Sequence, residues 1–387
     1  MFFSDEQNLI RDTARHFARE QIAPHVAEWE HQHVVPRHLL GDLGKLGLMG
    51  VCVDPAWGGA GADFVAYVLA TVEIAAADAG ICNMMNVHNS PVCAALQAYG
   101  TAAQKERLLR PLAQGWRFGA FLLTEPEVGS DAGAIRTRAV RRGDRYVLNG
   151  VKQFITSGES AHVAMILAVT DPAAGRHGIT CFVTATDNAG YRVVRREDKL
   201  GHRNCDTCQI ALEDMEIPAE DVLGEEGGGY KIALSFLNGG RIAVAAQALG
   251  VARAALDHAL RYGREREAFG KPIIEHQAVQ FRLADMATKV ETATQMMLYA
   301  ARLKDAGAPC LKEASMAKLY ASEVAEQVTS DAIQIHGGYG YLSDFPVEKL
   351  YRDARVFQIY EGTSEVQRMV IARHLKGAVP LRRRSRA

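Results

Sequence analysis

The sequence predicts an α+β protein of three parts: an N-terminal all-α domain over residues 1–117, a middle antiparallel β-barrel or sandwich domain over 118–225, and a C-terminal four-helix-bundle domain over 226–387. Three observations predict this order. Apolar residues recur at helical spacing before Phe118, short β-branched and aromatic runs alternate with turn residues up to about Gly224, and helical periodicity then returns. A chain of 387 residues, 48% of them hydrophobic, can bury cores in more than one domain.

The N-terminal part is predicted to be a series of helices. Ser4 is a suitable cap for a first helix that runs to about Trp29, and Pro36 opens a second that runs toward Leu48. Further helices are expected over about residues 63–79, 88–99 and 101–114. The glycine-rich loop Trp57–Gly61 lacks the spacing of a phosphate-binding fingerprint, and no clear strand precedes it, so we expect no phosphate cradle there.

The middle part is predicted to be a compact antiparallel β domain. Arg145–Leu148 and Lys152–Thr156 flank Asn149-Gly150, a dipeptide typical of a hairpin turn. Further strands are expected over Val163–Thr170, Gly178–Thr184 and Gln209–Leu212. The pair Cys205 and Cys208 has CxxC spacing, but it lies in strand-like sequence without a second pair, so we expect neither zinc binding nor dithiol chemistry.

Long helices are predicted after Gly227–Gly229. Apolar residues there alternate four and three positions apart, which predicts helices with one buried stripe each, packed as a bundle. The two stripes consist of Val279, Leu283, Met286, Val290, Ala293 and Met297, and of Ala317, Ala321, Val324 and Val328.

Composition and charge argue against several functional classes. A net charge of −1 argues against a nucleic-acid-binding surface, and the basic run Arg382–Arg386 is expected to be a solvated tail. No apolar run approaches membrane-spanning length in the sequence, so we expect no membrane insertion, and we expect no metal site. The N-terminus shows no signal or transit pattern, which favours a cytoplasmic location, and the seven scattered cysteines are expected to be reduced.

The most informative stretch is Tyr351–Arg368, in which Glu361 stands between an apolar run and a break at Gly362. Ser364 and Gln367 have the spacing of a capping box, which predicts that a helix starts here. A carboxylate held partly out of water on such a turn has a raised pKa and can act as a general base. The turn alone nevertheless favours a surface glutamate whose charge the helix dipole stabilises.

Two segments resemble one enzyme family. Ile359-Tyr-Glu-Gly-Thr-Ser-Glu365 resembles the catalytic-base segment of the acyl-CoA dehydrogenases, and Phe121-Leu-Leu-Thr-Glu-Pro-Glu-Val-Gly-Ser-Asp131 resembles their flavin signature. The resemblance covers nearly the whole chain and implies the family's three-domain fold and FAD. It further implies that Glu361 removes the α-proton of an acyl-CoA thioester while the β-hydrogen leaves as hydride to the flavin, which yields a trans-2-enoyl-CoA.

The same resemblance implies the FAD contacts. The expected set is Phe121, Leu123, Thr124, Gly129, Ser130, Phe154, Thr156, Arg266, Phe269, Gln277, Gln334, Gly338, Thr363 and Glu365. Many family members have Trp at the position of Phe154. Arg266–Gly270 and Gln334–Gly338 resemble segments that reach the FAD of a neighbouring subunit, which implies a homotetramer built as a dimer of dimers. On its own Arg266 would be an ordinary surface arginine, and we expect His336 to be structural.

The expected substrate contacts are Ser130, Asn238, Arg241, Tyr360 and Gly362. Asn238–Arg241 resembles the opening of the helix that lines the family's acyl-CoA site, and Asn238 stands where many members have Asp. A minority of the family places its base at the position of Gly240, and because glycine cannot serve, the resemblance assigns Glu361. The backbone N–H of Glu361 and a ribityl hydroxyl of FAD are the implied donors to the enolate oxygen.

Substrate and electron acceptor are less closely defined. The resemblance implies electron-transfer flavoprotein as the acceptor and fatty acid or branched-chain amino acid catabolism as the setting. Local matches to short-chain and isobutyryl-CoA-type enzymes favour a short, and also a 2-methyl-branched, acyl-CoA, whereas Met84–Pro91, expected at the acyl pocket, leaves chain length open. The alternatives are an oxygen-using acyl-CoA oxidase or flavin monooxygenase of the same fold, and a non-enzymatic CoA-binding or scaffold protein.

Overall fold

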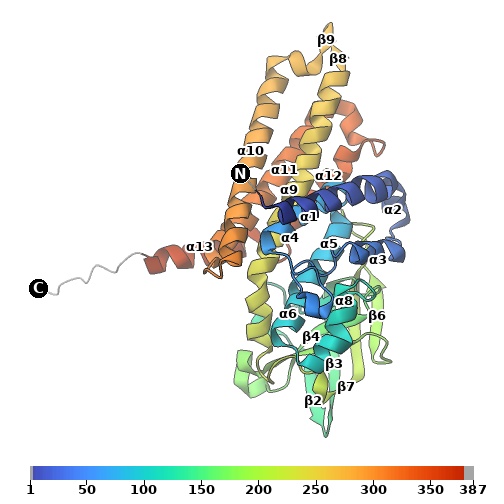
Figure 1. Cartoon of the computed structure of the whole chain (residues 1–387), viewed down its shortest axis with the longest axis vertical. Helices are drawn as coiled ribbons and strands as arrows, with labels where there is room; N and C mark the ends of the chain where they lie inside the picture. The colour runs from blue at the N-terminus through green and yellow to red at the C-terminus, as the bar shows by residue number, and fades with distance from the viewer. Residues whose placement is uncertain (1–2, 379–387) are drawn as a thin grey trace, which may run out of the picture.

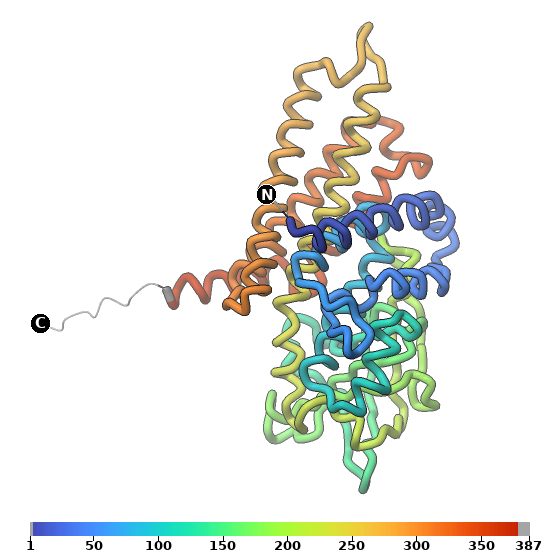
Figure 2. Tube along the Cα trace, viewed as in Figure 1, coloured from blue at the N-terminus to red at the C-terminus, as the bar shows by residue number. Residues whose placement is uncertain are grey.

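The computed structural model describes residues 3–378, with a β-sheet toward one end of the molecule and long helices toward the other (Figures 1 and 2). The helix α9 (Gly229–Glu265) connects the two ends, because it starts beside the sheet and leads into the hairpin of β8 (Glu267–Ala268) and β9 (Lys271–Pro272) at the far end (Figure 1). The basic run Arg382–Arg386 lies outside the described residues.

The N-terminal part is helical, as predicted. The label η marks a short π or 3₁₀ helix. The elements are α1 (Asp5–Phe17), η1 (Ala18–Ile22), η2 (Ala23–His25), α2 (Val26–Gln32), α3 (Arg37–Lys45), η3 (Pro55–Trp57), α4 (Phe64–Ala77), α5 (Ala79–Val87), η4 (His88–Cys93), α6 (Ala94–Tyr99), α7 (Ala102–Gln104), η5 (Lys105–Leu109) and α8 (Arg110–Ala113). Ser4 caps α1, because its Oγ accepts the N–H of Gln7 at 3.1 Å. The predicted continuous helix to Trp29 is interrupted around Pro24. The helix α5 lies where none was predicted, because it is buried on nearly all sides and so has no amphipathic period.

The middle part forms one mixed sheet. Its elements are β1 (Gly119–Leu122), η6 (Ala132–Ala134), β2 (Arg138–Arg142), β3 (Arg145–Thr156), β4 (Val163–Val169), η7 (Pro172–Gly178), β5 (Ile179–Ala185), β6 (Tyr191–Arg196), β7 (Thr207–Pro218) and η8 (Ala219–Asp221). The strand order is β1-β4-β2-β3-β7-β6, and β5 also pairs with β4. The prediction of a purely antiparallel domain is wrong in two pairings: β1 and β4 are parallel, with Gly119 opposite Val163, and β2 and β4 are parallel, with Arg138 opposite Val169. Parallel strands are joined by a long connection and not by a short turn, so the sequence near either strand does not indicate the pairing.

The hairpin predicted at Asn149-Gly150 is wrong, because β3 continues through this dipeptide. The register against β7 shifts here, and Asn149 pairs with Asp214 of β7: Asn149 Nδ2 donates to Asp214 Oδ1 at 3.0 Å, and Asn149 Oδ1 accepts the N–H of Asp214 at 2.9 Å. The dipeptide therefore forms a bulge. The real hairpin turn is Gly143-Asp144, where Gly143 has φ 63°.

The C-terminal part is a helical bundle. After α9 and the β8–β9 hairpin come η9 (Ile273–Glu275), α10 (Gln277–Asp305), α11 (Leu311–His336), η10 (Gly337–Tyr341), α12 (Pro346–Ala354), η11 (Arg355–Gln358) and α13 (Ser364–Ala378). The predicted stripes are confirmed at Met286 and Met297 of α10 and at Val328 of α11, because these side chains are fully buried. The helices α1, α4 and α5 share one hydrophobic core with α9, α10 and α11.

The interior position of α9 explains its composition. By length and composition α9 could span a membrane, so the expectation that no apolar run approaches that length is wrong for this helix. However, 72% of its most apolar window is buried inside the protein, as in the core helix of a globular fold. All seven cysteines are free thiols, and among residues 3–378 no cluster of three His, Cys, Asp or Glu side chains is placed to hold a metal ion.

Candidate active site

The chain turns sharply between η11 and α13, at Glu361. Glu361 has φ 53° and Gly362 has φ 89°, so two consecutive residues adopt the left-handed conformation. Glycine does so without steric cost, whereas a glutamate in this region is uncommon and is held there by its surroundings. Phe357, which is fully buried, anchors the chain just before the turn. The backbone therefore fixes the direction in which the Glu361 side chain leaves.

The helix after this turn starts differently from the prediction. Thr363 rather than Ser364 is the cap, because Thr363 Oγ1 accepts the N–H of Val366 at 3.3 Å, while the buried Oγ of Ser364 lacks a partner among the described residues. The predicted capping box is therefore wrong. The Nε2 of Gln367 instead donates to the carbonyl oxygens of Glu361, at 3.3 Å, and Gly362, at 2.9 Å, so this side chain holds the turn itself.

The Glu361 carboxylate lies against α9 at Gly240. A Cβ atom on Gly240 would lie 2.8 Å from Oε2 and 3.3 Å from Cδ of Glu361, so the absence of a side chain at this position makes room for the carboxylate. Burial raises the pKa of Glu361 above its ordinary value, while the positive charges of Lys318 and Arg241 lower it. The group therefore combines a fixed position with the raised pKa that the turn predicted.

Lys318 of α11 is fully buried beside the turn, and its Nζ donates to the carbonyl oxygen of Gly362 at 2.7 Å. Burial lowers the pKa of Lys318 to about 8, although the charge of Glu361 raises it. The sequence interpretation missed this residue. A signal was nevertheless present, because Lys318 lies four positions after Ala314 and three before Ala321, within a buried apolar stripe where a lysine requires a partner.

Asn238 and Arg241 lie inside α9 rather than at its start, so the prediction that this segment opens the helix is wrong. Arg241 Nη1 donates to Asn238 Oδ1 at 3.2 Å, while the buried Nε has no hydrogen-bond partner within the described chain. Burial lowers the pKa of Arg241, although Glu361 raises it. A buried guanidinium with a free donor beside the carboxylate suits a ligand that supplies an acceptor.

Tyr360 and its neighbours brace the turn from behind. The hydroxyl of Tyr360 donates to Gln247 Oε1 at 2.8 Å, and Gln247 Nε2 donates to the carbonyl oxygen of Ala79 at 2.7 Å. Gln247 is fully buried in α9, and Ala79 begins α5. The hydroxyl is thus engaged within the protein, and a contact of the Tyr360 ring with substrate stays a prediction.

A buried ion cluster fastens α12, the helix that leads into the turn. Lys349 Nζ lies 2.9 Å from Asp78 Oδ2 and 2.6 Å from Asp353 Oδ2. Asp353 Oδ1 also accepts the N–H of His202 at 2.6 Å, and the His202 ring packs edge-on against Tyr360, with ring centroids 6.4 Å apart. Asp78 joins α4 to α5, and His202 lies between β6 and β7. The cluster therefore joins the N-terminal helices and the sheet part to the segment before Glu361.

A second buried ion pair shapes the loop after β1, where flavin contacts were predicted. Lys152 Nζ lies 2.9 Å from Glu125 Oε1 and donates to the carbonyl oxygen of Leu123 at 3.1 Å. The N–H of Gln153 donates to the carbonyl oxygen of Thr124 at 2.8 Å. Leu123 and Thr124 are thereby held beside the end of β3.

The end of β3 presents Phe154 and Thr156. Phe154 has φ 59° at an irregularity in the register, and its side chain is 64% exposed. Thr156 Oγ1 accepts a hydrogen bond from Asn83 Nδ2 of α5 at 3.2 Å, a contact that the sequence did not indicate. Phe121, on β1, is half-buried, and Gly129 and Ser130, in the loop after β1, are exposed. These residues and the Glu361 turn are the first group of expected FAD contacts, and Thr156 is linked to the turn through α5 and Gln247.

The remaining predicted FAD contacts lie elsewhere, near the opposite end of the molecule. They are Arg266, Phe269, Gln277, Gln334 and Gly338. Figure 1 shows the β8–β9 hairpin, with Phe269-Gly270 at its tip, far from β2 and β3. The guanidinium of Arg266 lies 5.8 Å from the ring centroid of Tyr339, and with Gly337 and Gly338 these residues line a groove of about 400 Å³. A single chain therefore does not bring the two groups of residues together.

Both groups have features that fit parts of FAD. A Cβ atom on Gly129, Gly337 or Gly338 would meet no atom within 4 Å, so the backbone there is open to a ligand. The free N–H groups at the start of α13, where Thr363 and Glu365 lie, and the charge of Arg266 suit a pyrophosphate. The ring of Phe269 is 98% exposed and provides an apolar surface for a partner to cover.

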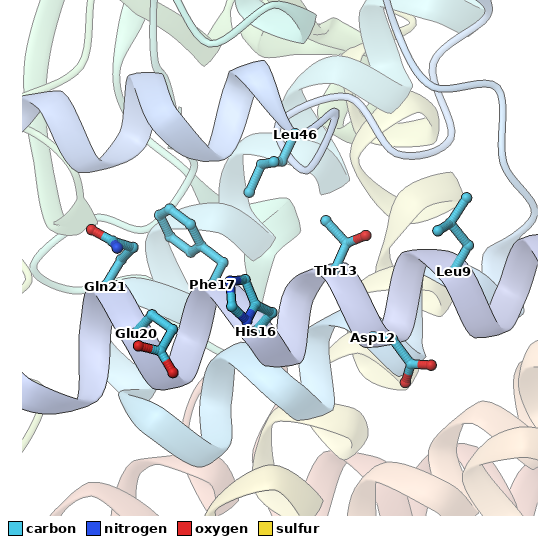
Figure 3. A pocket seen from close by; sticks show the side chains of 8 residues that line it. All are labelled: Leu9, Asp12, Thr13, His16, Phe17, Glu20, Gln21 and Leu46. Carbon is cyan, nitrogen blue, oxygen red and sulfur yellow. The ribbon is translucent and has the colours of Figure 1, made fainter.

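A separate groove of about 490 Å³ lies along α1 and η1 (Figure 3). It is lined by Leu9, Asp12, Thr13, His16, Phe17, Glu20, Gln21 and Leu46. None of these residues belongs to either group of expected site residues.

Three family models match the chain in succession. The acyl-CoA dehydrogenase N-terminal domain model matches residues 4–116, the middle domain model matches 120–215, and the C-terminal domain model matches 227–376. An acyl-CoA dehydrogenase of Bacillus subtilis is 45% identical over 377 residues, which are 97% of this chain and 100% of the relative. The short-chain specific mitochondrial acyl-CoA dehydrogenase of Mus musculus is 43% identical over 371 residues, 96% of this chain and 90% of the relative.

Solved structures agree with these matches. Butyryl-CoA dehydrogenase from Megasphaera elsdenii has a TM-score of 0.95 at 42% identity, covering 97% of this chain and 99% of its own. A chain in a structure of the electron transferring flavoprotein of Acidaminococcus fermentans has a TM-score of 0.96 at 44% identity, with coverage of 97% and 99%. A glutaryl-CoA dehydrogenase from Mycobacterium smegmatis in complex with FADH2 has a TM-score of 0.92 at 31% identity, with coverage of 98% and 97%. The chain therefore belongs to the acyl-CoA dehydrogenase family and is an FAD-dependent oxidoreductase that acts on acyl-CoA.

Proposed function

We propose that Glu361 is the catalytic base, which removes the α-proton of a short acyl-CoA so that a trans-2-enoyl-CoA forms. The observation that carries this proposal is the position of the carboxylate, on a left-handed turn, facing Gly240, with a pKa raised by burial. A carboxylate with a raised pKa is a stronger base than one in water. The positive charges of Lys318 and Arg241 lower this pKa and so favour the ionised form that a base needs before the reaction.

Removal of the α-proton places negative charge on the thioester oxygen, which then requires hydrogen-bond donors. The backbone N–H of Glu361 is suited to this role, because within residues 3–378 it donates to no backbone acceptor. When bound, FAD supplies a ribityl hydroxyl as a second donor and accepts the β-hydrogen as hydride. Arg241, with its free buried Nε, can orient the part of the substrate that passes α9.

The short acyl chain is proposed from the space beside α9. A Cβ atom on Gly239 would lie 3.4 Å from Ser90 Oγ, 3.4 Å from Lys304 Cε and 3.6 Å from Phe64 Cε2, so three side chains pack closely against α9 one residue before Gly240. The likeness to butyryl-CoA and short-chain specific enzymes supports the same reading. We include 2-methyl-branched acyl groups because Leu237–Arg241 resembles isobutyryl-CoA-type enzymes.

We also propose a dimer-based homotetramer that passes electrons to electron-transfer flavoprotein. The support for a dimer is that the β8–β9 hairpin, which carries Phe269, lies far from the sheet, whose strand β3 carries Phe154 and Thr156, so a second chain is needed to complete the site (Figure 1). The support for the acceptor is the similarity to a chain in an electron transferring flavoprotein structure. A monomer that retains its full FAD content in sedimentation followed at flavin wavelengths would contradict the dimer.

The base is tested with Glu361→Gln in anaerobic stopped-flow measurements. Glutamine keeps the size of the side chain, so FAD and substrate should still bind and substrate should still perturb the flavin spectrum. Flavin bleaching should slow by on the order of 10²–10⁴ or more, because the amide cannot accept the α-proton. The matched control is Glu365→Gln, an exposed glutamate on the same segment, which should bleach at nearly the wild-type rate when loaded with FAD. Rapid bleaching by Glu361→Gln would place the base elsewhere.

The substrate is tested by specific activity over straight and 2-methyl-branched acyl-CoAs from about four carbons upward. We expect the maximum among the short chains, whereas a maximum at about ten or more carbons would contradict the closed space beside α9. Exposure of the bleached enzyme to air distinguishes a dehydrogenase from the alternative, an oxygen-using enzyme of the same fold. Slow reoxidation by oxygen is expected for a dehydrogenase, and rapid reoxidation would favour an oxidase.

A further inference from the structure

Lys318 is a buried cation beside the Glu361 turn, and it comes from a different element, α11. Its side chain is fully buried, and its Nζ donates to the carbonyl oxygen of Gly362 at 2.7 Å. Taking an ammonium group out of water is costly unless partners compensate for the lost hydration. A lysine at this position therefore has to find its partners at the turn.

The bond to Gly362 acts together with a second donor. Gln367 Nε2 donates to the same oxygen at 2.9 Å and to the carbonyl oxygen of Glu361 at 3.3 Å. The two side chains thus hold both carbonyl groups of the left-handed pair. Because a left-handed glutamate persists only where its surroundings enforce it, these bonds account for the conformation that aims the carboxylate at Gly240.

The charges around the turn give Lys318 a second effect. Lys318 faces the carboxylate of Glu361, the guanidinium of Arg241 from α9, and the carboxylate of Glu365 at the start of α13. The phenols of Tyr67 and Tyr360 also lie near Glu361. Burial raises the pKa of each phenol, and the charge of Glu361 raises it further, so both phenols are neutral. Among residues 3–378, Lys318 and Arg241 are therefore the charges that oppose the effect of burial on Glu361, and Lys318 is the larger influence of the two.

We propose that Lys318 is a positioning residue for the base: it fixes the turn through the Gly362 carbonyl and supplies the buried positive charge that keeps Glu361 ionised. This inference rests on the proposed role of Glu361. The sign of its effect follows from the charges. A cation lowers the pKa of a nearby carboxylate, so removal of the cation raises that pKa, and a larger fraction of the base is protonated and inactive at neutral pH.

The test uses Lys318→Met, which removes both donor and charge, and Lys318→Gln, which keeps a donor and removes the charge. The rate of flavin bleaching by substrate is measured anaerobically against pH. Both variants should shift the acid limb of the profile to higher pH by about one unit or more, since an opposite charge near a carboxyl group changes its pKa by about 1–3 units. Lys318→Gln should retain more of the rate at its pH optimum. The matched control is Ser315→Ala, a buried residue of the same helix that bonds only to its own helix, and its acid limb should not move.

A second readout does not depend on catalysis. Thermal unfolding of Lys318→Met, Glu361→Gln and the double variant forms a double-mutant cycle, and the double variant should lose less stability than the single losses added together, because neutral partners no longer leave a buried charge unpaired. Additive losses together with an unshifted acid limb would overturn the inference. If Glu361→Gln itself bleaches rapidly, the proposed base is wrong; if it is inactive while Lys318→Met keeps the wild-type acid limb, only the role of Lys318 fails. If Lys318→Met does not fold, Lys318→Gln takes its place. The acid limb of Lys318→Gln and the stability of its double variant with Glu361→Gln then decide in the same way.

Discussion

A methyl group on Gly240 should separate the position of the Glu361 carboxylate from the stability of the fold. Gly240 lies in the interior of α9, where replacing glycine by alanine favours the helix by about 1 kcal/mol. The new Cβ atom would lie 2.8 Å from Oε2 and 3.3 Å from Cδ of Glu361, whereas ordinary contact begins at 3.4 Å. The carboxylate must therefore move by roughly 0.6 Å, and because it is the far end of a flexible side chain it can do so without unfolding the helix.

Gly240→Ala is assayed by anaerobic stopped-flow, with thermal unfolding and FAD content measured on the same preparation. A misplacement of about 1 Å at a reacting group can cost about 10²-fold, so we expect flavin bleaching to slow by about 10- to 100-fold. The unfolding temperature should stay the same or rise, and FAD content should not change. A slower reaction in a protein of equal or higher stability assigns the loss to the geometry of the base.

Gly239→Ala is the matched control, because it makes the same replacement one residue earlier in the same helix. Its Cβ atom would lie 3.4 Å from Ser90 Oγ and Lys304 Cε and would not face Glu361, so bleaching by a short substrate should remain much nearer the wild-type rate. Wild-type bleaching by Gly240→Ala with normal FAD content would show that the carboxylate does not work from this position. An equal loss in Gly239→Ala would show that the effect belongs to the helix and not to the carboxylate.

Two further predictions concern the surroundings of the site. Glu365→Gln, near the start of α13, should lower FAD retention measured by dialysis while the loaded enzyme bleaches at nearly the wild-type rate; unchanged retention would contradict a role in the cofactor site. Lys349→Met leaves the fully buried Asp78 and Asp353 without their cation and should reduce the free energy of unfolding by about 3–5 kcal/mol, whereas Lys45→Met, which breaks an exposed pair with Asp42, should cost less than about 1 kcal/mol. Equal losses in denaturant titrations of the two lysine variants would refute the cluster as a structural anchor.

The parts of the fold that the sequence predicted well are those set by local pattern. Heptad-like spacing placed Met286, Met297 and Val328 in the core, and Ser4 and Gln7 formed the cap that their spacing predicted. The Glu361 turn was also predictable, because its break and its apolar flank lie within a few residues. In each case a short window of sequence contains all of the interacting groups.

The wrong predictions have a different cause, which is that another group takes the hydrogen bonds that the motif was expected to make. The dipeptide Asn149-Gly150 has the composition of a hairpin turn, but its partner Asp214 lies on β7, and that pairing makes the dipeptide a bulge within one strand. Ser364 and Gln367 have capping-box spacing, but Gln367 finds the carbonyl groups of the left-handed turn instead. A turn or cap motif therefore predicts the local chain only when no other group, near or distant in sequence, competes for its hydrogen bonds.

Three buried lysines show what such distant contacts do near this site. Lys152 bonds the flavin-side loop at Leu123, Lys318 bonds the Glu361 turn at Gly362, and Lys349 joins the N-terminal helices and the sheet part to the helix before that turn. Lys152 and Lys318 bond carbonyl groups of irregular segments, whereas Lys349 pairs with the carboxylates of Asp78, between α4 and α5, and of Asp353 on α12. A lysine suits this task because its long stem packs among apolar side chains while its ammonium group offers three donors. In sequence each looks like an ordinary surface charge, and only its place within an apolar pattern, as for Lys318 between Ala314 and Ala321, indicates burial. A lysine inside such a stripe therefore indicates a buried partner elsewhere in the chain. In this protein those partners include the loop after β1, at Leu123, and the Glu361 turn, at Gly362.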